Sequence, residues 1–377
     1  MQIPLARPTF YEEDIRLYEK YIEDILRSGR LTLGKYLKKF EEMLREFIGA
    51  KYAIAMSSCT AALHAIMWSL NIKSGDEVIV PTYTFASTVN SVIYVGAKPV
   101  LVDSDLDTFN ISIDDVANKI SSRTKAIIAV HVGGNPADLR ALLDLAEDHD
   151  LVLIEDAAHA LGSYYYDRHV GTFSKVSAFS FYPNKIITTG EGGAAVTDDT
   201  HLAEKLKIIR CVGRTGLGPT EVIDLGHNFR MSELQAALGL VQMRRISEIL
   251  DTRRRIATYY NERFKYIDEI ILQQLTKGAK SSYYAYIVRI DEDAGISRDD
   301  IRKKLQEDYG IETTIIYKPI HLHQYYKNVL KIKEGSLPNA ELLGRTTLAL
   351  PIYGHMSVNE AEYVINAIED ILSQFNA

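Results

Sequence analysis

Between about residues 52 and 198, short β-rich apolar runs alternate with stretches of helical periodicity, and this alternation limits the fold more than any other feature. Runs such as EVIV, AIIAV and LVLIE have a continuous apolar character. Strands of this kind are buried on both faces, as in a parallel sheet covered by crossover helices. The sequence therefore predicts an α/β fold with a mainly parallel sheet. The runs expected to form its strands are YAIAM, EVIV, PVLVDSD, KAIIAVHV, LVLIEDA, KVSAFSF and GAAVTDD.

Polar side chains follow several of the predicted strands at the point where each strand ends. Ser58 comes after YAIAM, Asp103 after PVLV, His131 after AIIAV and Asp156 after LVLIE. Ligands of open α/β sheets bind outside the carboxyl ends of the strands. We therefore expect the functional site along this edge of the sheet.

The C-terminal part of the chain has a different pattern. SELQ, at residues 232–235, has the form of a capping box and opens a long helix that leaves the sheet. A strand-like YYAYIVRI, a helix from about residue 297 to 308 and a closing helix from about 358 to 375 follow. We expect a large domain over residues 1–250, with an N-terminal helical segment, and a small α+β domain over residues 251–377. No linker is visible, so the two should pack tightly.

Charge and composition exclude several classes of function. The formal net charge is −7, and no long block of lysine and arginine is present, so nucleic acid is not expected as the main partner. The two cysteines, Cys59 and Cys211, form no disulfide framework, and the first thirty residues lack an apolar signal core, which favours a reducing, cytoplasmic setting. The longest apolar runs fall short of the roughly 20 residues of a membrane helix, so no membrane segment is expected.

Asp156 and Lys185 are the first candidates for chemistry. A carboxylate at the end of a buried strand needs a partner, and Lys185 follows the next strand-like run, KVSAFSF. Pyridoxal phosphate chemistry requires such a pair, because a lysine forms an imine with the cofactor aldehyde while a carboxylate keeps the pyridine nitrogen protonated. Taken singly, Asp156 is explained as a helix N-cap and Lys185 as a solvated charge. The combination favours a cofactor site.

A phosphate anchor is expected where MSSCTAALHAI leads from a strand into a helix. Ser58, Cys59 and Thr60 precede a helix that begins near Ala61, and the free N–H groups and dipole of a helix N-terminus favour a dianion. Simple N-capping by Ser58 is the alternative. Ser180, five residues before Lys185, adds a hydroxyl from the facing strand end.

Two rings and three glycines complete the predicted site. Phe85 stands where an aromatic ring can stack on a flat ligand, and His159 points from the first turn after Asp156 toward the same pocket, although a core aromatic and a structural histidine are open alternatives. Glycines 190, 192 and 193 allow a backbone to approach closely. GRTGLG, at residues 213–218, lacks the order of a dinucleotide fingerprint, and two histidines, His321 and His323, are weak grounds for a metal, so none is expected.

Segments spread over nearly the whole chain resemble the DegT/DnrJ/StrS sugar aminotransferases. These are fold-type I pyridoxal phosphate enzymes that act on nucleotide-linked ketosugars. The resemblance implies a large domain with a mainly parallel seven-stranded sheet and a smaller C-terminal α+β domain. The matching segments are SGRLTLGKYLKKFE, SSCTAALHA, VPTYTFASTVN, IEDAAHALGS, SFYPNKIITTGEGG, GHNFRMSELQAALG and YKPIHLHQYY.

The resemblance also implies roles for individual residues. Lys185 would form the imine, Asp156 would pair with the pyridine nitrogen, His159 would lie near the phenolic oxygen and Phe85 would stack on the ring. The retained lysine argues against the dehydratase branch of the family, in which a histidine replaces it. The phosphate cradle would include Cys59, Thr60 and Ser180.

The partner subunit and the substrates are implied in the same way. Asn228, in GHNFRM, matches an asparagine that reaches the phosphate of the neighbouring subunit, so a homodimer with shared sites is expected. Arg230 and His321 are candidates for contact with the donor carboxylate or the sugar nucleotide. A surface arginine and a capping histidine are the alternatives. Sugar selection would depend on the 213–220 loop and on the segment around Tyr317.

The implied reaction is a ping-pong transamination. Glutamate donates the amino group and leaves as 2-oxoglutarate, the cofactor passes through its pyridoxamine phosphate form, and the nucleotide-linked ketosugar leaves as an aminosugar. ITTGEGG, after Lys185, resembles members that aminate C4, such as perosamine and 4-amino-arabinose synthases, whereas members acting at C3 more often have NLGAxGDxG. A C3 aminotransferase and a non-catalytic sensor with the same pocket remain the alternatives.

Overall fold

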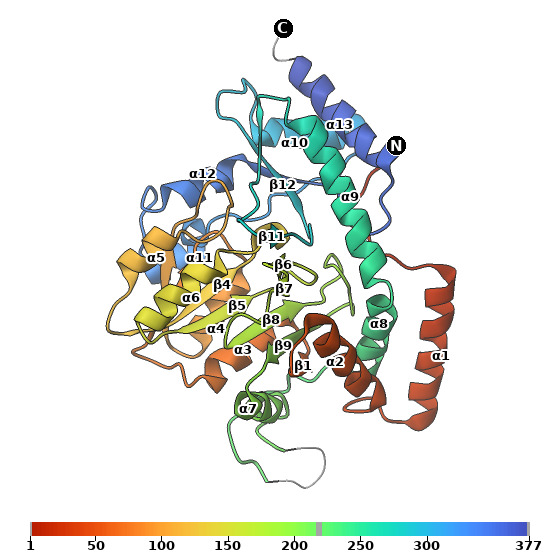
Figure 1. Ribbon diagram of the computed structural model, residues 1–377, viewed down its shortest axis with the longest axis vertical. Helices are drawn as coiled ribbons and strands as arrows, with labels where there is room; N and C mark the ends of the chain where they lie inside the picture. The colour runs from red at the N-terminus through yellow and green to blue at the C-terminus, as the bar shows by residue number, and fades with distance from the viewer. Residues whose placement is uncertain (1, 216–220, 375–377) are drawn as a thin grey trace.

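The computed structural model describes residues 2–215 and 221–374 and has a seven-stranded central sheet (Figure 1). The strands lie in the order β1-β9-β8-β5-β4-β2-β3, and all neighbours are parallel except β9, which is antiparallel to both β1 and β8. The mainly parallel sheet predicted from the apolar runs is therefore confirmed. The strands are β1 (Tyr52–Met56), β2 (Glu77–Pro81), β3 (Lys98–Val102), β4 (Thr124–Val130), β5 (Val152–Asp156), β8 (Val176–Ser180) and β9 (Gly193–Thr197).

Helices cover both faces of this sheet, which explains why the strands are apolar throughout. In β4, Ile127 and Ala129 belong to one core, while Ala126 and Ile128 belong to the core on the opposite face. The first core is closed by α2 (Lys35–Ile48), α5 (Ile113–Lys119), α6 (Leu139–Asp148) and α8 (Glu233–Met243). The second is closed by α3 (Cys59–Ser69), α4 (Ala86–Tyr94) and α7 (Thr200–Arg210).

The C-terminal part has its own antiparallel sheet and its own core. Its strands are β10 (Ile270–Leu272), β12 (Tyr286–Ile290) and β13 (Thr347–Leu350). The helices of this part are α10 (Arg298–Tyr309), α11 (Gln324–Leu330), α12 (Pro338–Thr346) and α13 (Val358–Ser373). Helix α1 (Glu12–Ser28) packs on α8, and a small sheet joins β6 (Tyr164–Tyr165), β7 (Arg168–His169) and β11 (Ala279–Lys280).

Helix α9 (Ile246–Phe264) connects the two parts without a break (Figure 1). Leu250 packs in the core of the central sheet, whereas Ile256 packs in the C-terminal core. The boundary expected near residue 250 thus lies inside a continuous helix. Ile3, which that division assigns to the large domain, packs in the C-terminal core and donates its N–H to the Gly310 carbonyl.

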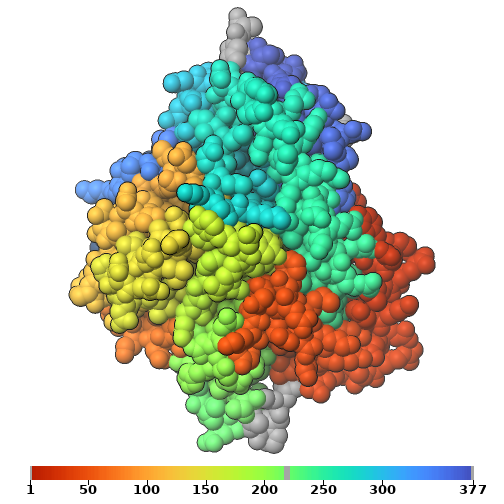
Figure 2. Space-filling view, viewed as in Figure 1, coloured from red at the N-terminus to blue at the C-terminus, as the bar shows by residue number. Residues whose placement is uncertain are grey.

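The two parts pack closely, and Figure 2 shows the C-terminal part resting directly on the sheet part over a continuous surface. Backbone hydrogen bonds cross between them, for example from Ala285 N to Gly133 O at 3.2 Å and from Ile320 N to Thr82 O at 2.8 Å. None of the helices in the described residues combines the length and apolar character needed to cross a bilayer.

Candidate active site

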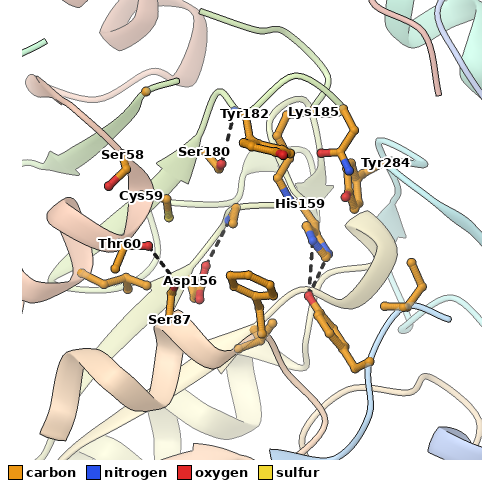
Figure 3. A pocket seen from close by; sticks show the side chains of 18 of the residues that line it. Ser58, Cys59, Thr60, Ser87, Asp156, His159, Ser180, Tyr182, Lys185 and Tyr284 are labelled. Carbon is orange, nitrogen blue, oxygen red and sulfur yellow. Dashed lines mark hydrogen bonds between the residues drawn. The ribbon is translucent and has the colours of Figure 1, made fainter. Parts of the chain in front are cut away.

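A cavity of about 480 Å³ opens at the carboxyl ends of β5 and β8, between the central sheet and the segment 314–317 (Figure 3). The walls come from the start of α3, the start of α4, the loop between β8 and β9, and Tyr284. The cavity therefore lies at the sheet edge where the polar strand ends predicted it. The sequence-predicted residues that line it are Ser58, Cys59, Thr60, Phe85, Asp156, His159, Ser180, Lys185, Gly192 and Tyr317.

Asp156 is a buried carboxylate without a cationic salt-bridge partner among the described residues. It is the last residue of β5, is 5% exposed, and accepts hydrogen bonds from Thr88 Oγ1 at 2.8 Å and from Ala158 N at 3.2 Å. Burial raises the pKa of the Asp156 carboxyl above its usual value, and these two hydrogen bonds oppose the shift. A cation placed against this carboxylate would offset the cost of burying its charge.

Lys185 reaches the same cavity from the loop that follows β8 (Figure 3). Since β5 and β8 are parallel neighbours, with Asp156 opposite Ala178, the two functional groups leave adjacent strand ends. The backbone N–H of Lys185 donates to Tyr182 O at 3.0 Å, which fixes the turn that carries it. Its Nζ lies 4.2 Å from the centre of the Tyr284 ring.

The first turn of α3 forms the wall opposite the loop. Ser58 is its N-cap and accepts a hydrogen bond from Ala61 N at 3.0 Å, so the capping role is present. The N–H groups of Cys59 and Thr60 precede any intrahelical acceptor and suit an anion. A Cβ on Gly193 would lie 2.3 Å from Cys59 N, so the close approach that the glycine allows is to this helix start.

Hydroxyl groups and a thiol complete this wall. Thr60 Oγ1 and Ser87 Oγ are 2.7 Å apart, and Ser180 Oγ accepts a hydrogen bond from Tyr182 N at 3.4 Å. Burial raises the pKa of the Cys59 thiol well above its usual value, so this side chain stays protonated and uncharged. The wall therefore offers donors to an anion without adding negative charge.

His159 stands between two tyrosine rings in the cavity wall. Its imidazole stacks on Tyr284 with 3.9 Å between ring centres, and Tyr317 Oη lies 3.2 Å from Nε2 and 3.3 Å from Nδ1. Burial and the charge of Lys185 hold the pKa of His159 well below its usual value, so the ring is neutral at physiological pH. Phe85 is 64% exposed although it is apolar, and it presents its ring at the cavity.

Asn228, Arg230 and His321 lie outside the cavity lining, as do Gly190 and Gly193. Asn228 is exposed and pairs with Cys211 in a β-bridge, while Arg230 forms a β-bridge with Met56. His321 is fully buried: Nδ1 lies 2.8 Å from Thr82 Oγ1 and Nε2 lies 3.0 Å from Glu341 Oε1. These contacts give His321 a structural environment. In the 213–220 loop, residues 216–220 lie outside the described part of the chain.

Other lining residues were not predicted from the sequence. Tyr284 belongs to the segment YYAYIVRI, which was assigned only to a strand. Thr88 lies behind the lining, one turn after Phe85, and donates a hydrogen bond to Asp156. The hydroxyl of Thr88, three residues after Phe85 in PTYTFAST, could have been predicted to face the same site from its spacing. No local sequence pattern indicated Tyr284. The remaining polar side chains at the cavity are Ser87, Tyr182, Asn184, Glu191 and Thr314.

Comparison with known proteins gives consistent matches. The profile of the DegT/DnrJ/EryC1/StrS aminotransferase family matches residues 13–369. The chain is 36% identical to the spore coat polysaccharide biosynthesis protein SpsC of Bacillus subtilis, over 98% of this chain and 97% of that protein. PseC of Helicobacter pylori, an aminotransferase involved in the biosynthesis of pseudoaminic acid, has a TM-score of 0.91 at 30% identity, with 100% of each chain covered.

A further structural neighbour has been solved in two cofactor forms. Spr1654 of Streptococcus pneumoniae has a TM-score of 0.92 in its PLP form, at 30% identity with 100% of each chain covered. Its PMP form has the same TM-score at 29% identity, over 100% of this chain and 99% of that chain. The fold class is therefore that of the fold-type I aminotransferases, as predicted.

The residues at the cavity fit pyridoxal phosphate. A buried carboxylate that lacks a cationic partner suits a protonated pyridine nitrogen, and the N-terminus of α3 suits a phosphate group. The exposed Phe85 ring suits a flat aromatic ligand, and Lys185 is a primary amine in reach of the same space.

Proposed function

The chain belongs to the DegT/DnrJ/EryC1/StrS aminotransferase family of pyridoxal phosphate-dependent sugar aminotransferases, and on that premise we propose that it moves the amino group of glutamate to C4 of a nucleotide-linked ketosugar. The products would be a 4-amino sugar nucleotide and 2-oxoglutarate. One observation carries the proposal. Asp156 and Lys185 come from the ends of two adjacent strands and line the same cavity.

Lys185 would act both as the attachment point of the cofactor and as the group that moves protons. When bound, the cofactor supplies an electron sink for the pair left by a broken C–H bond. Nζ of Lys185 would accept the proton from Cα of glutamate, and in the second half of the cycle it would deliver a proton to C4 of the sugar. The placement of Nζ at the cavity wall supports this role.

Asp156 and the start of α3 would bind the two charged ends of the cofactor. The Asp156 carboxylate would hold a proton on the ring nitrogen, and Thr88 and Ala158 orient its two oxygens by hydrogen bonds. The N–H groups of Cys59 and Thr60 would bind the phosphate, together with the hydroxyls of Thr60 and Ser180. His159, held neutral by burial, would contact the ring oxygen by a hydrogen bond and not by charge.

A second copy of the chain would complete the site. Among the described residues that line the cavity, Lys185 is the single lysine or arginine, whereas the phosphate, the carboxylates of glutamate and a nucleotide diphosphate bring several negative charges. Asn228 is exposed and Arg230 has one buried guanidinium nitrogen without a hydrogen-bond partner in the structure. We propose that these two residues serve the site of a partner subunit in a homodimer, and that His321, held by Thr82 and Glu341, has a structural role.

Amination at C4 and the biological setting are further parts of the proposal. The segment ITTGEGG supports C4, and its Glu191 and Gly192 line the cavity, where they would meet the sugar. Amination at C3 by the same cofactor residues is the second candidate.

The relative named for spore coat polysaccharide biosynthesis supports a role in making aminosugars for polysaccharides. Two buried free cysteines suit the reducing conditions of the cytoplasm.

The test is a panel of UDP-, GDP- and dTDP-linked 4-ketosugars and 3-ketosugars, each incubated with the purified protein, pyridoxal phosphate and glutamate. We expect one nucleotide series to give 2-oxoglutarate and an aminosugar in equal amounts, with nitrogen at C4 by NMR. Turnover of the 3-ketosugars in preference to the 4-ketosugars, with nitrogen at C3, would favour the second candidate. Absence of turnover with 4-keto and 3-keto substrates alike would contradict the aminotransferase proposal.

A further inference from the structure

Tyr284 presents its ring to the two groups that would carry out the chemistry. Lys185 Nζ lies 4.2 Å above the ring centre, and the His159 imidazole stacks on it with 3.9 Å between centres and 25° between planes (Figure 3). Among the described residues, the Tyr284 hydroxyl has no hydrogen-bond partner in the structure. The contacts of Tyr284 with the site are therefore made by the face of its ring.

The backbone that carries Tyr284 is held on both sides. Ser282 Oγ donates to the carbonyl of His159 at 2.9 Å, and Ala285 N donates to the carbonyl of Gly133 at 3.2 Å, so the segment is tied to the carboxyl edge of the central sheet. Arg253 of α9, itself buried, donates to the carbonyl of Tyr284 at 3.1 Å. These bonds fix the backbone from which the ring reaches Lys185 and His159.

Lysine otherwise has a flexible side chain, and its amino group must remain near the reacting carbon whenever it is not linked to the cofactor. The face of an aromatic ring attracts an ammonium group by about 0.5–2 kcal/mol, depending on how far the site excludes water. This attraction holds Nζ at the cavity wall. It also favours the state in which Nζ has taken up a proton.

We propose that Tyr284 is a positioning residue, whose ring face holds the amino group of Lys185 at the cavity and favours its uptake of the substrate proton. The inference rests on the proposed role of Lys185. In the step concerned, Nζ would take the proton as the Cα–H bond of glutamate breaks, and the bound cofactor would supply the acceptor for the electron pair of that bond. Loss of the ring face slows this step without weakening the binding of glutamate.

The experiment compares four variants with the wild type. Tyr284→Leu and Tyr284→Met remove the ring, Tyr284→Phe keeps the ring and removes the hydroxyl, and Tyr283→Leu makes the same change at a neighbouring tyrosine outside the cavity lining. The holoenzymes are mixed with glutamate in D₂O without a ketosugar, and NMR follows the exchange of the Cα proton. Crystal structures of the cofactor-free proteins report the position of Lys185 Nζ.

We expect exchange to slow by about 3- to 30-fold in Tyr284→Leu and Tyr284→Met, with the glutamate concentration for half-maximal rate unchanged. Tyr284→Phe and Tyr283→Leu should exchange within about twofold of the wild type, because the attraction comes from the ring face. In the cofactor-free crystals, Nζ should leave its place over residue 284 in the Leu and Met variants and keep it in Tyr284→Phe.

Two results would overturn the inference. One is exchange at the wild-type rate in both Leu and Met variants with Nζ unmoved. The other is a slowing of the exchange in Tyr284→Phe as large as in Tyr284→Leu, which would assign the effect to the hydroxyl group and not to the ring. A failure of the proposed function would give a different result from a failure of this inference. If Lys185 does not move the proton, Lys185→Ala would exchange the Cα proton as fast as the wild type.

Discussion

Thr88 Oγ1 donates a hydrogen bond to Asp156 Oδ2 across 2.8 Å, and both side chains are buried. Thr84 Oγ1 lies 2.8 Å from Thr88 Oγ1 and can donate to it, so the proton of Thr88 is free to point at the carboxylate. The hydrogen bond favours the ionised carboxylate, against the burial that raises its pKa. Thr88 thus supports the charge that the proposed pairing with the cofactor requires.

Thr88→Val should weaken cofactor binding. The valine keeps the shape of the side chain but leaves Asp156 Oδ2 without its donor, and loss of a hydrogen bond to a buried charged group costs about 1.5–3 kcal/mol. We expect the dissociation constant for pyridoxal phosphate, measured by absorbance titration of the cofactor-free protein, to rise by about tenfold or more. Thr88→Ser retains the hydroxyl and should bind nearly as tightly as the wild type. Equal binding by the Val and Ser variants would show that the hydroxyl has no such role.

Glu155→Ala should destabilise the protein strongly. The side chain of Glu155 is fully buried, and it accepts hydrogen bonds from the backbone N–H groups of Gly171, Phe173 and Ser174 and contacts His131 Nε2 at 3.1 Å. Removing it leaves the buried N–H of Gly171 and the partly buried N–H groups of Phe173 and Ser174 without their acceptor, so we expect a loss of about 3 kcal/mol in the free energy of unfolding. Urea unfolding measures this loss. A control change at the exposed Glu46 should leave the free energy of unfolding within about 0.5 kcal/mol of the wild-type value.

Glu77 should make part of the stability depend on acid pH. Its buried carboxylate accepts hydrogen bonds from Ser121, Arg123 and Lys98, which lower its pKa from 4.5 to about 2. Because the pKa is lower in the folded state, the stabilisation is complete above pH 4.5 and is lost as pH falls toward 2. Because the basic partners of Glu77 are exposed to solvent, we expect its ionised carboxylate to contribute about 1–2 kcal/mol to the free energy of unfolding.

The measurement for Glu77 is the free energy of unfolding of the wild type and Glu77→Gln between pH 7 and pH 3. The wild type should be the more stable protein at pH 7, and the two curves should converge as the pH falls. A constant difference at every pH would show that the charge of Glu77 contributes nothing.

Shared active sites predict that two inactive variants restore each other. Lys185→Ala lacks the amine, and Asn228→Asp places a negative charge where the partner's phosphate is proposed to bind. In a mixed dimer, one of the two sites has both residues intact. Co-refolded equal mixtures should therefore recover ~25% of the wild-type activity, since half of the dimers are mixed. No recovery in mixtures shown to contain mixed dimers would contradict a site built from two subunits.

The sheet and half of the site were predictable because they depend on local pattern. Alternate residues of β4 enter opposite cores, so its sequence had to be apolar throughout. Asp156 and Lys185 meet because parallel neighbouring strands end at one edge. Tyr284 was not predictable, because long-range bonds from Arg253 and Ser282 bring its segment to the cavity. His321 was proposed for substrate contact, but Thr82 and Glu341, both remote in sequence, enclose it.

The central claim is that Lys185 holds the cofactor and drives the transamination. The most direct measurement is to add pyridoxal phosphate to the purified protein, reduce with borohydride, and locate the labelled residue by mass spectrometry, with turnover of glutamate and a 4-ketosugar assayed in parallel. The account predicts a label on Lys185, and loss of both the yellow imine absorbance and turnover in Lys185→Ala. A label on another lysine, or a Lys185→Ala protein that keeps the absorbance and the turnover, would contradict it.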